Sequence, residues 1–92
     1  MLYQIHPRNS FKKGLKLASK RNKDLSKIEF IIKQLQSGAA LHEKHSDHSL
    51  LGNYNGFREC HIEPDWLLIY RVEINEKLLI LEATGSHSDL FK

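Results

Sequence analysis

The sequence contains a single cysteine and no long apolar run, and each shortage excludes a class of protein. Cys60 has no second cysteine to pair with, so an intrachain disulfide framework is excluded. The longest apolar run, WLLIY at residues 66–70, is far shorter than the roughly 20 residues of a membrane-spanning helix. Met1 is not followed by the basic and apolar stretches of a secretory signal. We therefore expect a cytoplasmic protein without a membrane partner.

The length of the chain predicts one folded domain, spanning residues 1–92. A chain of 92 residues can bury one two-layer core and is too short for two. The hydrophobic fraction of 40% and the charged fraction of 27% are those of an ordinary globular protein. No repeat, low-complexity tract or interdomain linker interrupts the sequence.

Acidic residues are scarce between residues 8 and 27. This stretch has eight basic residues and one acid, Asp24, and so a net charge of +7, whereas the whole chain carries +3. Such an asymmetry suits a surface that binds a polyanion and releases its counterions. A lysine-rich helix face that is merely solvated is the alternative. The residues predicted to form this basic surface are Lys12, Lys13, Lys16, Lys20, Arg21 and Lys23.

Hydrophobic periodicity predicts a short strand followed by two helices. Residues 2–5 alternate weakly before Pro7 and read as the strand. Asn9 and Ser10 are suitable caps for a first helix, and Asp24 is a suitable cap for a second one. Gly38 marks the end of the second helix. The predicted apolar stripes are Phe11, Leu15 and Ala18 in the first helix and Leu25, Ile28, Ile31, Ile32 and Leu35 in the second.

The second half of the chain predicts a long surface loop and then three strands. Residues 39–56 lose periodicity, and strands are expected at residues 57–62, 66–72 and 77–84. We expect an α+β fold in which both helices cover one face of a small, mainly antiparallel sheet and leave the other face partly open.

Alternation in the first of these strands divides its side chains between the two faces. Phe57, Glu59 and His61 should lie on one face, and the side chains of residues 58, 60 and 62 on the other.

Six histidines are candidate functional residues. His6 precedes Pro7 and reads as structural or solvated. His42, His45 and His48 recur at intervals of three, which leaves a small metal-binding protein as one alternative. Zinc sites usually need three or four ligands on a fixed scaffold, and the lone cysteine faces away from His61, so we expect neither a metal nor a cofactor.

His61 and His87 each stand beside other reactive groups. If the strands form a meander, the turn at Asp65 approaches the segment that follows the last strand, where His87 lies. Two histidines on opposite sides of a phosphodiester can cleave RNA without a metal, because one removes the 2′-OH proton and the other protonates the departing 5′ oxygen. No G-x-S-x-G motif is present, and none is needed, because the nucleophile belongs to the substrate.

Four further residues are predicted to bind the substrate. Arg58 and Arg71 are the cations available for the transition-state charge, and Trp66 and Phe91 are the aromatics available for stacking on unpaired bases. For Trp66, a place in the core or at the sheet edge is the alternative.

Three motifs occur in order and resemble one family. They are DHSLLG at residues 47–52, HIEPDW at residues 61–66 and TGSHSDLF at residues 84–91. At this spacing the sequence resembles the YafQ branch of the RelE superfamily of bacterial toxins, and the resemblance extends over the N-terminal half. It implies a microbial RNase-like fold with a short C-terminal helical turn.

The resemblance also implies a function, which is that of the toxin of a type II toxin-antitoxin system. Such a toxin is a ribosome-dependent messenger-RNA endonuclease that inhibits translation. The family's catalytic residues fall on His48, His61, Asp65 and His87, with Phe91 at the substrate. His87 would be the general acid and His48 the base, while the other two would orient groups or stabilise charge.

The implied partners are an antitoxin of the ribbon-helix-helix type, the ribosome and its message, and operator DNA only through the antitoxin complex. Residues 8–27 could meet ribosomal RNA or an acidic antitoxin helix. One position departs from the family, because relatives commonly carry a basic residue where this chain has Ala83. A non-catalytic corepressor or antitoxin-binding module derived from such a toxin is therefore the alternative function.

Overall fold

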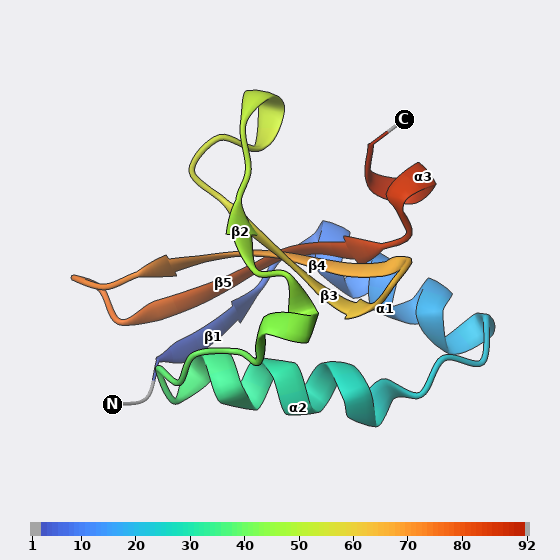
Figure 1. Ribbon diagram of the computed structural model, residues 1–92, viewed down its shortest axis with the longest axis horizontal. Coiled ribbons are helices and arrows are strands. Elements are labelled where there is room, and N and C mark those ends of the chain that lie inside the picture. Colours follow the sequence, from blue (N-terminus) through green and yellow to red (C-terminus); the bar gives the residue numbers. More distant parts are fainter. Residues whose placement is uncertain (1–2, 92) are drawn as a thin grey trace.

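The computed structural model of the protein describes residues 3–91, which form a five-stranded sheet with two long helices on one face (Figure 1). Two short 3-10 helices, η1 and η2, lie before the central hairpin, and η2 and α3 project from the side of the sheet opposite to α2. The elements are β1 (Gln4–Pro7), α1 (Asn9–Lys20), α2 (Leu25–Gln36), η1 (Glu43–His45), β2 (His48–Ser49), η2 (Gly52–Tyr54), β3 (Arg58–Glu63), β4 (Trp66–Glu73), β5 (Leu78–Gly85) and α3 (His87–Leu90).

The sheet has the strand order β1-β5-β4-β3-β2. β1 runs parallel to β5 and the other three pairings are antiparallel, so the predicted α+β fold with a mainly antiparallel sheet is confirmed. β1 begins two residues later than predicted, and Leu2 lies outside the described residues. Pro7 can end this strand because β1 is an edge strand, where a missing backbone N–H is tolerated.

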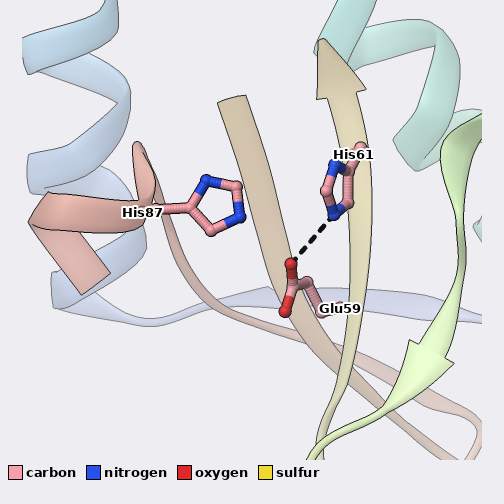
Figure 2. A group of neighbouring side chains, drawn as sticks. All are labelled: Glu59, His61 and His87. Atoms are coloured by element: carbon pink, nitrogen blue, oxygen red, sulfur yellow. Dashed lines mark ion pairs between the residues drawn. The ribbon is translucent and has the colours of Figure 1, made fainter. Parts of the chain in front are cut away.

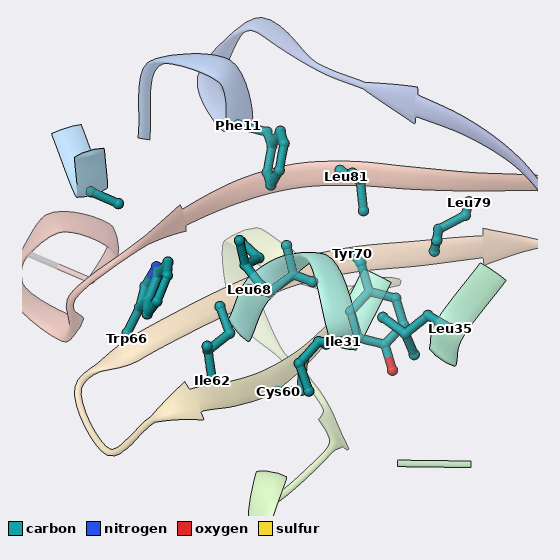
Figure 3. Close-up of a cluster of buried hydrophobic side chains, with 12 residues drawn as sticks. Phe11, Ile31, Leu35, Cys60, Ile62, Trp66, Leu68, Tyr70, Leu79 and Leu81 are labelled. Atoms are coloured by element: carbon teal, nitrogen blue, oxygen red, sulfur yellow. The ribbon is translucent and has the colours of Figure 1, made fainter. Parts of the chain in front are cut away.

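Both helices bury their apolar stripes against the same face of the sheet (Figure 3). Gly14 lets α1 approach β5 closely, because a Cβ at this position would collide with the backbone carbonyl of Thr84. Of the predicted stripes, Leu15, Leu25 and Ile32 are only partly buried and pack at the margin of the core. The core itself consists of Phe11, Ala18, Ile28, Ile31, Leu35, Cys60, Ile62, Trp66, Leu68, Tyr70, Leu79 and Leu81.

Cys60 is a free thiol at the centre of this core. Burial raises its pKa to about 12, so the thiol stays protonated and unreactive while the protein is folded. No helix among residues 3–91 is long and apolar enough to cross a bilayer.

The helix caps follow the sequence prediction in one case and depart from it in the other. The Asp24 side chain accepts a hydrogen bond from the backbone N–H of Ser26 at 3.0 Å, as predicted for the cap of α2. The predicted caps of α1, Asn9 and Ser10, are wrong, because both lie inside its first turn and the N-cap is Arg8. The Ser10 hydroxyl instead donates to the carbonyl of Glu82 in β5, which ties the start of α1 to the sheet.

The segment predicted as a loop, residues 39–56, contains a strand as well as the two 3-10 helices. β2 pairs with β3, and His48 stands opposite Glu59. Two residues are too few to show alternation, so periodicity could not predict this strand. Its pairing nevertheless brings a histidine from a distant part of the chain to the sheet.

The prediction that Trp66 stacks on RNA bases is wrong, and the alternative of a core aromatic is confirmed. Only 2% of the residue is exposed. Its indole Nε1–H donates to the hydroxyl of Thr84 at 3.1 Å, and that hydroxyl donates to the carbonyl of Leu67 at 2.6 Å. Trp66 therefore fastens β4 to β5 beneath the helices.

Replacing Trp66 by Phe should destabilise the protein without weakening RNA binding. The change removes one hydrogen bond and leaves a small cavity, which together should lower the free energy of unfolding by about 1–3 kcal/mol. Denaturant titration measures the stability, and KM for a message substrate measures binding. A variant of unchanged stability and raised KM would restore the stacking role.

Glu63 joins the end of β3 to the segment between the helices and to the first turn of α2. Its Oε1 lies 2.9 Å from the Nζ of Lys23 and its Oε2 lies 2.8 Å from the Nζ of Lys27. Hydrogen bonds from Lys27 and then Lys23 lower the pKa of Glu63 below its ordinary value of 4.5.

Because that pKa is lowered by folding, the stabilisation is complete above about pH 4.5 and is lost as the pH falls through the lowered value. Glu63→Gln should therefore lower Tm at pH 7 and flatten the decline of Tm between pH 4.5 and 2. The matched control is Glu76→Gln in the exposed β4–β5 turn, which should leave the Tm profile of the wild type unchanged. Equal Tm profiles for both variants would contradict the role given to Glu63.

Candidate active site

The face of the sheet that the helices leave open carries a cluster of histidines and carboxylates. Cys60 and Ile62 of β3 enter the core under the helices, so Glu59 and His61 point to the other face, as the alternation predicted. Pairing with β2 places His48 on this face opposite Glu59. Two elements thus bring three polar side chains together.

Glu59 is the centre of the cluster, and sequence reasoning did not identify it as a site residue. Its side chain is only 7% exposed. One carboxylate oxygen lies 3.1 Å from Nε2 of His61, and the other lies 3.6 Å from Nε2 of His48. A buried carboxylate needs such partners, because its charge is costly to remove from water. The signal available in the sequence was a carboxylate in mid-strand on the same face as His61.

His87 reaches the cluster from the C-terminal side of the sheet. Ser86 and Asp89 form a capping box in which Ser86 Oγ accepts from the N–H of Asp89 at 3.2 Å and Asp89 accepts from the N–H of Ser86 at 2.9 Å. This box starts α3 at His87, which confirms the predicted C-terminal helical turn.

Asp65 fixes the orientation of His87. One oxygen of its carboxylate accepts from the backbone N–H of His87 at 2.8 Å and from the ring Nδ1–H at 2.7 Å. These two bonds, the backbone one first, lower the pKa of Asp65, which therefore stays ionised at neutral pH. With Nδ1 donating, Nε2 is the nitrogen left for chemistry. The predicted approach of the first hairpin turn to the end of the last strand is confirmed.

His61 and His87 face each other across Glu59 (Figure 2). Their ring centroids are 5.7 Å apart, and the ligand atoms of Glu59, His61 and His87 all lie within 4.8 Å of one another. His48 is next to them, with its ring centroid 6.5 Å from that of His61. The Nδ1–H of His48 donates to the carbonyl of Ser46 at 2.6 Å, which leaves Nε2 unprotonated in the neutral ring.

Aromatic rings extend the cluster along the open face. Phe91 lies 6.4 Å from the ring of His87 and 5.7 Å from that of Tyr54, which in turn lies 6.4 Å from Phe57. The guanidinium of Arg71 lies over Phe57, 4.7 Å from the ring centroid. The structure thus brings Phe91 to the histidines and places Arg71 one step further out. Tyr54 and Phe57 had no predicted role, because their spacing in the sequence marks no motif.

Arg58, which was predicted to be a substrate-binding cation, does not join the cluster. It lies on the helix-covered side of β3, where Nε is 3.1 Å from Asp47 Oδ1 and Nη1 donates to Ser49 Oγ at 2.9 Å. The Tyr70 hydroxyl donates to the same Asp47 oxygen at 2.7 Å. This network anchors the loop before β2, so the alternation that brings Glu59 to the site takes Arg58 away from it.

Ala83 lies in the same cross-strand row as Glu59. Ile69 of β4 pairs with Glu59 on one side and with Ala83 on the other, and all three face the open side of the sheet. Ala83 is buried, with 6% of the residue exposed. A longer basic side chain at this position would extend over the site, which explains how its absence here could matter.

The predicted basic surface separates into two groups. Lys12, Lys13, Lys16 and Lys20 are exposed along α1. Lys23 is paired with Glu63, and Arg21 is paired with Asp89, to which its Nη1 and Nη2 donate at 2.7 and 3.2 Å. The open cationic surface is therefore α1 itself.

The three evenly spaced histidines do not form one metal site. Nδ1 of His42 accepts from the N–H of Lys44, and Nδ1–H of His45 donates to the carbonyl of His61. Among residues 3–91, the group close enough to hold a metal is Glu59, His61 and His87. Its oxygen and imidazole nitrogens are a donor set that transition metals accept.

Comparison with known proteins agrees with this geometry. Residues 3–92 match the family described as bacterial toxin of type II toxin-antitoxin system, YafQ. The mRNA interferase toxin YafQ of Escherichia coli strain K12 is 42% identical over 82 residues, which are 88% of this chain and 87% of that protein.

Two solved structures extend the comparison. A chain of the E. coli DinJ-YafQ toxin-antitoxin complex is 38% identical with a TM-score of 0.89, and the match covers 100% of both chains. A metal-bound toxin from Helicobacter pylori is 40% identical with a TM-score of 0.91, and the match covers 99% of this chain and 100% of that one. The resemblance predicted from the motifs is confirmed, and the chain belongs to the YafQ family of type II toxin-antitoxin toxins.

Proposed function

We propose that this toxin is a ribosome-dependent messenger-RNA endonuclease that works by histidine acid-base catalysis without a metal. The observation that carries the proposal is the pairing of two oppositely placed histidines with carboxylates, His87 with Asp65 and His61 with Glu59. The E. coli relative named mRNA interferase supports the substrate class.

The 2′-OH of the message is the nucleophile, and His48 is the base that activates it. Its Nδ1–H is held by the Ser46 carbonyl, so its unprotonated Nε2 can accept the 2′-OH proton. The imidazolium that results is stabilised by Glu59, whose oxygen lies 3.6 Å from that nitrogen. The 2′ oxygen then forms its bond to phosphorus.

His87 is the acid that completes the cleavage. Its Nε2–H gives a proton to the departing 5′ oxygen as the bond between that oxygen and phosphorus breaks, while Asp65 holds the ring through Nδ1. The products are a 2′,3′-cyclic phosphate and a 5′ hydroxyl. His61 and Asp65 are positioning and charge-stabilising groups, Phe91 contacts the substrate, and Arg71 is the cation on the same face that can approach the phosphate.

The proposed partners follow from the family and from the charge of α1. An antitoxin, of the ribbon-helix-helix type, neutralises the toxin, and operator DNA is bound only through that complex. The E. coli chain found in the DinJ-YafQ toxin-antitoxin complex supports the antitoxin partner. The exposed lysines of α1 bind ribosomal RNA, which places the active site at the message in the cytoplasm.

Replacing His87 by Ala should lower cleavage of ribosome-bound message by about 10²- to 10⁴-fold, because the leaving oxygen loses its acid. Purified ribosomes carrying a defined message provide the substrate, and mapping of both new ends identifies the products. The matched control is His6→Ala, since His6 is exposed on the edge strand β1. Full activity of His87→Ala would contradict the assignment.

A second candidate function is metal-assisted cleavage at Glu59, His61 and His87. Removing metal from the protein distinguishes it from the metal-free mechanism. Their proximity and the metal-bound H. pylori relative favour that candidate. We expect wild-type cleavage to persist after dialysis against EDTA. Activity that EDTA abolishes and Zn²⁺ or Cu²⁺ restores would replace the metal-free mechanism.

The corepressor alternative has its own test. If the folded wild-type protein never cleaves the message and its Ala83→Arg variant is equally inactive, the corepressor function is the one that is left.

Reversing the charge of Lys12, Lys13 and Lys16 to Glu should weaken ribosome binding more than antitoxin binding, because the first depends on phosphate contacts. Cosedimentation with ribosomes over a range of salt concentrations measures the effect, and the variant should also show a smaller salt dependence. The control reverses Lys33, Lys44 and Lys77, which are equally exposed but lie off α1. Equal ribosome binding by the two triple variants would exclude α1 as the RNA surface.

A further inference from the structure

Helix α3 carries His87 but has little to hold it in place. It consists of four residues, and none of them is buried. Its contacts with the core are therefore slight, and its orientation depends on polar contacts at its first turn. One of these is the bond from His87 to Asp65, which lies on an exposed turn.

The other contact joins α3 to α1. Arg21 donates to both oxygens of Asp89, from Nη1 at 2.7 Å and from Nη2 at 3.2 Å, across 68 residues of sequence. The fork of a guanidinium fixes direction as well as distance when it binds a carboxylate in this way. Arg21, followed by the backbone N–H of Ser86, lowers the pKa of Asp89, so the carboxylate stays charged.

Arg21 is itself held firmly at the end of α1. The N–H of Lys23 donates to the carbonyl of Ala18 and the N–H of Asn22 donates to that of Ser19, each at 3.0 Å. Asn22 has the left-handed φ of 61° that this type of helix end requires. The buried Ala18 and the paired Lys23 fix the turn on both sides.

We propose that Arg21 and Asp89 are positioning residues for His87. The Arg21–Asp89 pair holds α3 so that Nε2 of His87 faces Glu59 and His61. With α3 held in this way, Asp65 fixes the orientation of the imidazole ring. This assignment rests on the proposed function, and it replaces the prediction that Arg21 belongs to the RNA-binding surface. The carboxylate of Asp89 serves both the capping box of α3 and the guanidinium of Arg21, so one side chain starts the helix and fixes its direction.

A set of matched variants tests the pair. Asp89→Asn removes the charge but leaves an oxygen for the N–H of Ser86, and Arg21→Gln removes the fork. Each should lower kcat on ribosome-bound message by about 10-fold with little change in KM, because small misplacements of a catalytic group are costly. The double variant should be no worse than either single one, since both break the same contact. Lys33→Gln, which removes an exposed charge from α2, should keep the wild-type kcat.

Hydrogen exchange provides a readout that does not depend on activity. The amide of His87 donates to Asp65, so exchange at residues 87–90 should accelerate in Arg21→Gln and Asp89→Asn and stay unchanged in Lys33→Gln. If the wild type proves inactive as a nuclease, this comparison still tests whether the pair holds α3.

Two results would overturn the proposal. One is unchanged exchange at residues 87–90 in Arg21→Gln while the protein remains folded. The other is a raised KM with wild-type kcat in Arg21→Gln together with additive effects in the double variant, which would return Arg21 to RNA binding.

Discussion

The pleat of β3 is the constraint on which the site depends. Cys60 and Ile62 pack into the core beneath both helices, and the intervening residues must therefore face the open side. Pairing with β4 sets Glu59 opposite Ile69 and His61 opposite Leu67. A slip of one residue would turn Glu59 and His61 under the helices and turn the core residues to the other face, so the register is strongly specified. The site is thus placed by the packing of a core to which its reactive groups do not belong.

The other reactive groups reach the site through polar contacts rather than through burial. β2 is two residues long and brings His48 by pairing with β3, and α3 buries none of its residues. Glu59 and His61 are therefore set on a rigid strand, whereas His48 and His87 stand on short elements that few contacts secure. Precise alignment of these two histidines is most readily completed when a large partner orders the substrate against them, which accords with the proposed dependence on the ribosome.

The sequence was sufficient for the main strands, both helices and four of the candidate reactive groups. Periodicity located the helices and alternation gave the correct face for Glu59 and His61, because both patterns report burial directly. The motifs then pointed to His48, His61, Asp65 and His87 as candidates. What the sequence could not provide depends on tertiary contacts. β2 is too short for a pattern, and Trp66 is buried in the core although it follows directly after the candidate site residue Asp65. Arg58 is the neighbour of Glu59 in sequence but faces the opposite side of the sheet, toward Asp47.

The burial of Glu59 lowers the stability of the fold, and the proposed chemistry uses the same carboxylate. A carboxylate removed from water is destabilising unless it is well paired, and Ile69 and Ala83, its neighbours across the strands, provide no cation. One oxygen of Glu59 therefore lies 3.1 Å from Nε2 of His61, whereas the other lies 3.6 Å from Nε2 of His48, which carries no proton in the neutral ring. When His48 accepts the 2′-OH proton, a positive charge appears beside a carboxylate that is already in place. An interaction that strengthens only as the proton moves stabilises the transition state more than the ground state, and it therefore lowers the barrier. In the proposed mechanism, the proton taken by His48 therefore supplies the positive charge that Ile69 and Ala83 cannot provide beside Glu59.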